Sequence, residues 1–111
     1  MTVTTKDELR EALRQVEDPE LGVNIVDLGL VYALEWSEED GEVYIDLTLT
    51  SPGCPLGPEI IRDIKKTLRK FRDVYDVDVE LVWSPLWHPK MMSDKAKEEL
   101  GYDDEFGLGF Y

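Results

Sequence analysis

Apolar residues near the start of the chain recur at helical spacing, which predicts a helix over about residues 5–17. Thr5 and Glu8 form a capping-box pattern at its start, and Asp18 followed by Pro19 ends it. A second apolar stripe with the same period follows Cys54 and predicts a helix that ends near residue 71. Pro58 fits the first turn of that helix, where a missing N–H costs little.

Three other stretches follow the patterns of strands. We expect one strand over about residues 29–36 and a second, strictly alternating one over 43–50, joined into a hairpin by a turn that contains Gly41. In the second strand one face is apolar and faces the core, and the other is polar and carries Tyr44, Asp46, Thr48 and Thr50. A third strand is expected over about 76–83, and the tryptophans and methionines of residues 83–92 suggest an apolar seam over the sheet end. Ser93 then suits the N-cap of a short helix that Gly101 closes.

This order predicts an α/β (α+β) two-layer sandwich: a small mixed sheet of about three strands, two main helices on one face and a short C-terminal helix. We expect residues 1–111 to form one domain with an acidic, aromatic tail from about residue 102. The second sheet face and the strand edges need a cover, which an oligomer contact, a partner protein or solvent around acidic side chains can supply.

Charge narrows the range of partners. The net charge is −13, from 25 acidic and 12 basic residues, which disfavours nucleic acid and anionic membranes. No apolar run is long enough to span a bilayer and the N-terminus lacks an apolar signal core, so we expect a cytoplasmic protein. Six of the basic residues lie within 62–72; a solvated helix face is the simpler interpretation, and a docking patch for an acidic partner is the alternative.

The single cysteine, Cys54, lies between glycines and prolines where a predicted strand gives way to a predicted helix. A thiol at a helix N-terminus has a lowered pKa, because the helix dipole and free N–H groups favour the thiolate, which is the nucleophile and the metal ligand. The alternative is a small buried apolar residue at a tight turn. One cysteine cannot form an internal disulfide, which agrees with a reducing compartment.

Three segments resemble, in order, the motifs of the small metal–sulfur cluster assembly family of the SufT and PaaD type. They are EDPELGVNIVDLGLVY, LTLTSPGCP and VWSPLWHPKMMSDKAKEELG, and the resemblance spans about residues 7–101. The resemblance implies a role in assembling or delivering iron–sulfur clusters, or in maturing a multicomponent oxygenase, with Cys54 as the key residue. Client apoproteins and the cluster assembly machinery would then be the partners.

The family motifs place further candidates in this chain. The DPE signature falls on residues 18–20, the DLGLVY signature begins at Asp27, and Thr48 and Thr50 lead to Cys54. The threonine hydroxyls suit bonds to the thiolate or to a cluster sulfide, although Thr48 is more simply a strand residue. Asp27 is equally compatible with a turn, and Glu20 fits a turn better than an iron ligand.

His88 is the only histidine, and its imidazole suits iron or zinc, although a lone histidine in a loop more often has no such role.

One thiolate cannot hold a cubane cluster, which takes four cysteines. A cluster would therefore be transient, shared across a homodimer, or completed by other ligands. The alternatives are an adaptor without its own cluster, as in a PaaD-like accessory role, and an enzyme using Cys54 with His88 as base. We expect no catalysis.

Overall fold

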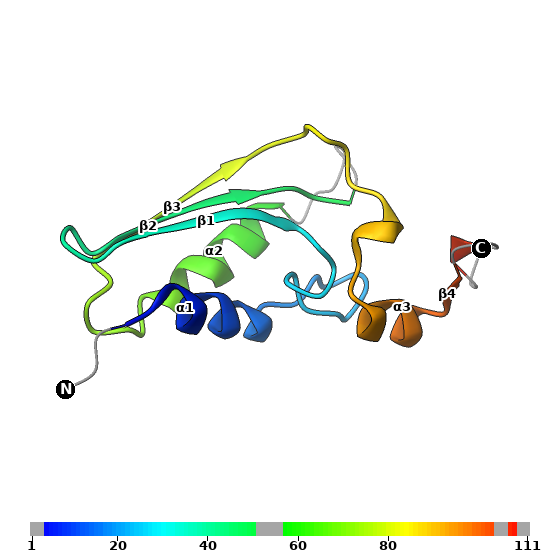
Figure 1. Ribbon diagram of the computed structural model, residues 1–111, viewed down its shortest axis with the longest axis horizontal. Coiled ribbons are helices and arrows are strands. Elements are labelled where there is room, and N and C mark those ends of the chain that lie inside the picture. Colours follow the sequence, from blue (N-terminus) through cyan, green and yellow to red (C-terminus); the bar gives the residue numbers. More distant parts are fainter. Residues whose placement is uncertain (1–3, 51–56, 104–106, 109–111) are drawn as a thin grey trace.

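The computed structural model describes residues 4–50, 57–103 and 107–108, and Figure 1 shows their helices and strands. The helical elements are α1 (Lys6–Ala12), η1 (Leu13–Gln15), α2 (Gly57–Leu68), η2 (Pro89–Met91) and α3 (Asp94–Leu100). The strands are β1 (Val31–Ser37), β2 (Glu42–Leu47), β3 (Asp76–Leu81), β4 (Tyr102–Asp103) and β5 (Gly107–Leu108).

The main sheet has the order β1-β2-β3 and is mixed, as the sequence predicts. β1 and β2 form the antiparallel hairpin, and β2 and β3 run parallel with α2 as the crossover between them. The carboxyl ends of β2 and β3 consequently lie at one edge of the sheet. In open α/β sheets this edge is the usual place for a binding site.

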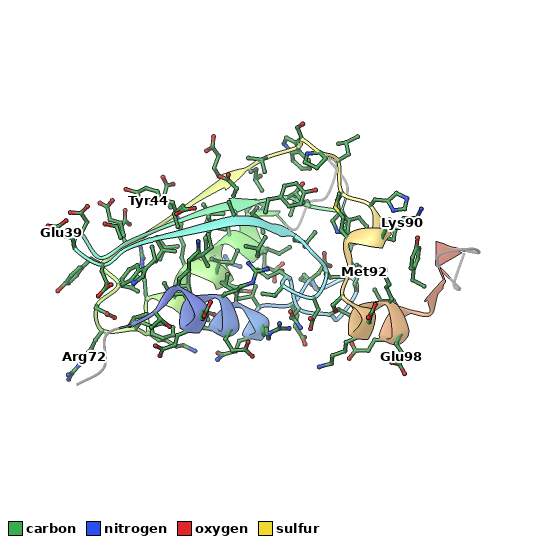
Figure 2. The ribbon with its side chains drawn as sticks, in the orientation of Figure 1. Glu39, Tyr44, Arg72, Lys90, Met92 and Glu98 are labelled. Carbon is green, nitrogen blue, oxygen red and sulfur yellow. The ribbon has the colours of Figure 1, made fainter. Side chains whose placement is uncertain are left out.

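Both α1 and α2 lie on the same face of this sheet, so the predicted two-layer arrangement is confirmed (Figure 1). Val43, Ile45 and Leu47 of β2 are almost completely buried beneath the helices. The alternate residue Tyr44 lies on the opposite face and is exposed, as Figure 2 shows. The apolar stripe of α2 is fully buried and consists of Ile60, Ile64 and Leu68.

The first helix is shorter than its apolar repeat predicts. The capping box of Thr5 and Glu8 is present, but the α-helix ends at Ala12 and tightens into the 3₁₀ turn η1. Val16 then takes an extended conformation, and its carbonyl accepts a hydrogen bond from the Ile25 N–H. The predicted continuation of the helix to residue 17 is therefore wrong. Val16 is buried, but it lies in extended backbone that bonds to Ile25 and not in a helix.

The second and third strands also end before their alternating patterns do. The Thr48 N–H donates to the Leu30 carbonyl, which precedes β1, and the Val82 N–H donates to the Leu47 carbonyl. Beyond these bonds the chain leaves the ladder, so β2 ends at Leu47 and β3 at Leu81. Likewise α2 ends at Leu68, and only hydrogen-bonded turns continue to Phe71.

The C-terminal helix α3 agrees with the prediction. The Ser93 hydroxyl accepts from the Ala96 N–H, and Gly101 closes the helix in the left-handed conformation. The sequence did not reveal the small β4–β5 pair, which forms within the predicted tail. Among the residues described, no helix combines the length and apolar character needed to cross a membrane.

Candidate functional site

The candidate site lies at the sheet edge where β2 and β3 end. Thr50 is the last described residue after β2, and Gly57 is the first residue of α2. Residues 51–56, which include the predicted key residue Cys54, lie outside the described residues. Two described segments are hydrogen-bonded to the end of β2: the turn of residues 24–30 through Leu30, and the loop of residues 82–92 through Val82.

Thr48 is completely buried, whereas its neighbour Thr50 is half-buried. The prediction that both lie on a polar face is therefore wrong for Thr48, which follows the last residue of β2 and is enclosed. Among the described residues its Oγ1 is a buried side-chain oxygen without a hydrogen-bond partner. Leaving a buried hydroxyl unpaired costs about 1–3 kcal/mol, so such a group calls for an explanation.

Asp27 is buried at the centre of a polar network at this end of the molecule. Its Oδ1 accepts from Arg14 Nη1 at 2.7 Å, and its Oδ2 accepts from Asn24 Nδ2 at 2.6 Å. The Asp27 backbone carbonyl accepts from the Ser93 N–H at 2.7 Å. The network ties together η1, the turn of residues 24–30 and the start of α3. Sequence reasoning missed Arg14, since nothing in the sequence pattern pairs it with Asp27.

The environment of Asp27 favours its ionised form. The hydrogen bond from Asn24 is the largest cause that lowers the pKa of Asp27; burial opposes it, and bonds from Arg14 and Ser93 lower the pKa further. The same ion pair raises the pKa of Arg14. Both carboxylate oxygens of Asp27 thus have partners already, which favours the structural interpretation of this residue over contact with a cluster.

We expect Asp27→Asn to lower the free energy of unfolding by about 1–2 kcal/mol near pH 7, since a charge-assisted bond to a half-exposed arginine is lost. A lowered pKa in the folded state stabilises the fold above the unfolded value of about 3.9, and this contribution is lost as the pH falls. The difference between the wild-type chain and the variant should therefore shrink below about pH 4. Urea unfolding across pH measures it, with the exposed Glu39→Gln as control; a constant difference would contradict the ion-pair account.

The loop of residues 82–92 is held against the site edge by specific contacts. The Tyr32 hydroxyl donates to the Pro85 carbonyl at 2.8 Å, and Trp87 Nε1 donates to the Leu28 carbonyl at 2.7 Å. Tyr32 lies where the β1–β2 register shifts, and such a bulge redirects a side chain. No sequence signal indicated this bulge. At Gly29, φ is +77° and an added Cβ would lie 2.5 Å from the Met91 carbonyl oxygen.

Four apolar side chains of this region remain at least one-third exposed. The sequence suggested one apolar seam over the sheet end, formed by the tryptophans and methionines of residues 83–92. Trp87 and Met92 fit that interpretation, because Met92 is buried in the core and Trp87 is partly buried against it. Lys90 and Met92, labelled in Figure 2, mark the end of the molecule where this loop lies. The exposed side chains are Leu81, Trp83, Leu86 and Met91.

The other candidate ligands lie on exposed turns. Glu20 is exposed, and its N–H donates to Asp18 Oδ1 at 2.8 Å, as the turn interpretation of this motif requires. His88 is exposed, and its Nδ1 accepts from the Lys90 N–H at the start of η2. Over residues 4–50, 57–103 and 107–108, no three histidine, cysteine or acidic residues are placed to hold a metal ion. The site roles predicted for Glu20 and His88 stay predictions.

Comparison with known proteins shows which protein family the chain belongs to. The sequence pattern of the family described as iron-sulfur cluster assembly protein matches residues 6–81, and the chain belongs to this family. It is 48% identical to the Fe-S protein maturation auxiliary factor YitW of Bacillus subtilis, over 91% of this chain and 98% of the relative. It is 50% identical to the Fe-S protein maturation auxiliary factor SufT of Staphylococcus aureus, over 78% of this chain and 97% of the relative.

The fold is similar to that of a solved relative. The crystal structure of a domain of unknown function, DUF59, from Bacillus anthracis superimposes with a TM-score of 0.83 at 41% identity. The match covers 88% of this chain and 92% of that one. The α+β fold with its mixed sheet is therefore that of the family.

Proposed function

We propose that this chain assists the assembly or delivery of iron–sulfur clusters to client apoproteins in the cytoplasm, without catalysing a reaction. Membership of the family and the names of the two maturation factors support this proposal. The cluster is cargo, and the Cys54 thiolate is the ligand that this chain contributes. The chain has one cysteine, so the remaining iron sites must be filled by a second copy, a small thiol or the client.

The main support for a cluster-binding site at this sheet edge is the buried hydroxyl of Thr48. Thr48 lies six residues before Cys54, and its Oγ1 has no partner among the described residues. A hydroxyl donor held ready at this position suits the negative charge that a thiolate or a cluster sulfide carries. The unpaired hydroxyl destabilises the metal-free protein and gains a partner when the cluster is bound.

We expect Thr48→Val to stabilise the metal-free chain by about 1 kcal/mol, because the variant keeps the side-chain shape and removes the unpaired hydroxyl. The same variant should retain less iron and sulfide after anaerobic reconstitution, since the donor to the cargo is lost. Thermal unfolding measures the first effect, and the visible absorbance of the reconstituted protein measures the second.

Thr50→Val is the matched control, because Thr50 belongs to the same segment and is only half-buried. It should change the unfolding free energy by less than about 0.5 kcal/mol. If Thr48→Val destabilises the chain and leaves cluster retention unchanged, the hydroxyl is a structural group and does not serve the cargo.

The exposed apolar side chains at residues 81–91 favour a second candidate function, an adaptor that binds clients without holding a cluster. Leu86 is 67% exposed in a loop that Tyr32 and Trp87 fix in place. Exposed apolar groups on a fixed loop are typical of a protein contact. An adaptor would bind its client equally well with Cys54 replaced, whereas a cluster carrier would not transfer cargo.

A further inference from the structure

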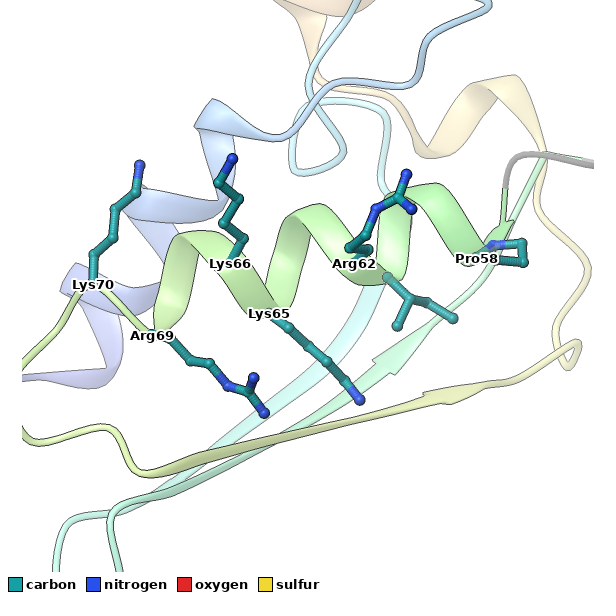
Figure 3. A pocket seen from close by; sticks show the side chains of 7 residues that line it. Pro58, Arg62, Lys65, Lys66, Arg69 and Lys70 are labelled. Atoms are coloured by element: carbon teal, nitrogen blue, oxygen red, sulfur yellow. The ribbon is translucent and has the colours of Figure 1, made fainter.

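The outer side of α2 carries a cationic groove, which Figure 3 shows. Its volume is about 680 Å³. Pro58 and Ile61 form its apolar part at the beginning of the helix, adjacent to the segment that contains Cys54. Its basic side chains are Arg62, Lys65, Lys66, Arg69 and Lys70.

Most of these cations have no partner within the described chain. Arg69 approaches Asp76 at 3.8 Å, but both side chains are more than half exposed and the pair contributes little. Arg62, Lys66 and Lys70 are exposed, and among the residues described no ion pair or hydrogen bond engages their side chains. In a chain with net charge −13, the groove is thus a local concentration of uncompensated positive charge.

The spacing of the cations indicates the shape of a complementary ligand. Arg62, Lys66 and Lys70 follow one another at four-residue intervals, and Lys65 and Arg69 form a parallel row. A helix rises 1.5 Å per residue, so the first row is about 12 Å long. Carboxylates spaced along two or three turns of a partner helix match this length, and an apolar side chain beside them would contact Ile61.

We propose that this groove, the α2 basic groove, is the docking surface for a short acidic segment of the protein that donates or receives the cluster. This inference rests on the proposed function and names the chemistry of its partner. The overall charge favours a short segment, because charges farther away than about 8 Å are screened at physiological salt. A long phosphate polymer would extend beyond the groove onto acidic surface and be repelled.

Binding of a synthetic acidic peptide tests the proposal. The probe is a fluorescein-labelled 12-residue helical peptide with three glutamates at four-residue spacing and one leucine, and anisotropy measures its Kd. We expect the combined substitution Lys65→Glu, Lys66→Glu and Arg69→Glu to weaken binding by about tenfold or more at 50 mM salt. Raising the salt to about 300 mM should weaken binding to the wild-type chain.

A matched variant separates the groove from net charge. Lys6→Glu, Arg10→Glu and Lys95→Glu change the charge equally on exposed positions of α1 and α3, and should leave Kd within about twofold. Four results would overturn the proposal: no binding of the peptide to the wild-type chain, equal losses in both variants, tighter binding of an oligonucleotide of equal charge, or wild-type self-association that only the groove variant abolishes.

Iron and sulfide retention in the same variants separates this inference from the proposed function. All variants should retain the cluster, since the groove binds the partner protein and does not hold the cluster. Failed peptide binding with normal retention would remove the docking surface and leave the proposed function intact. Failed retention in the wild-type chain would instead contradict the proposed function.

Discussion

Gly29→Ala is expected to lower the free energy of unfolding by about 2–4 kcal/mol, because two separate costs coincide at this residue. The backbone is left-handed, with φ at +77°, and an added Cβ would lie 2.5 Å from the Met91 carbonyl oxygen. Backbone atoms on both sides cannot rotate away from the clash, so the loop of residues 82–92 must shift. Thermal unfolding should show a fall in Tm of roughly 10–20 °C.

Gly22→Ala is the matched control for this variant. Gly22 has φ at +68°, but nothing lies within 4 Å of an added Cβ. Its substitution should therefore cost only the left-handed conformation, about 1 kcal/mol. Equal losses of stability at the two glycines would show that the close approach of Met91 to Gly29 does not constrain the fold.

Cys54→Ser is expected to reduce the iron and sulfide retained after anaerobic reconstitution by at least about tenfold, because the variant has no thiolate to offer. The fold should be unaffected, with an unfolding free energy within about 0.5 kcal/mol of the wild-type value. Iron and sulfide analysis together with urea unfolding measures both effects in one preparation.

His88→Ala and Glu20→Gln are controls for the weaker ligand candidates. Both residues are exposed, and their observed contacts are a 3₁₀ cap and a turn. Each variant should retain the cluster within about twofold of wild type, a difference worth less than ~0.5 kcal/mol.

A different result for Cys54→Ser would contradict the ligand role. If this variant lost several kcal/mol of unfolding free energy while cluster retention stayed unchanged, Cys54 would be a buried structural residue.

The layers of the fold could be predicted from the sequence because each follows from a local period. The helical period places Ile60, Ile64 and Leu68 on one face of a helix, and the strand period places Val43 and Ile45 on one face of a sheet. The caps at Thr5 and Ser93 are equally local, since each side chain bonds to an N–H three residues later. The ends of elements depend on distant partners, as Thr48 shows by bonding to Leu30.

The sequence motifs predicted which residues belong to the candidate site, but not how those residues contact one another. Asp27 was identified by the motif, but its pairing with Arg14 arises where η1 meets the turn of residues 24–30, and no period encodes it. The burial of Thr48 was missed, because strand alternation assigned it to the polar face that Tyr44 occupies. The bulge at Tyr32 likewise depends on the pairing of β1 with β2. These features are tertiary, and tertiary contacts override local preference.

Native mass spectrometry of the anaerobically reconstituted protein, with and without an apo-acceptor, tests the central claim that this chain handles a cluster through Cys54. We predict iron and sulfide in a species whose mass includes a second copy, a small thiol or the acceptor, their loss from this chain when the acceptor is added, and their absence in Cys54→Ser. Iron and sulfide absent from every wild-type species, with client binding unaffected by Cys54→Ser, would contradict the claim and leave only the adaptor.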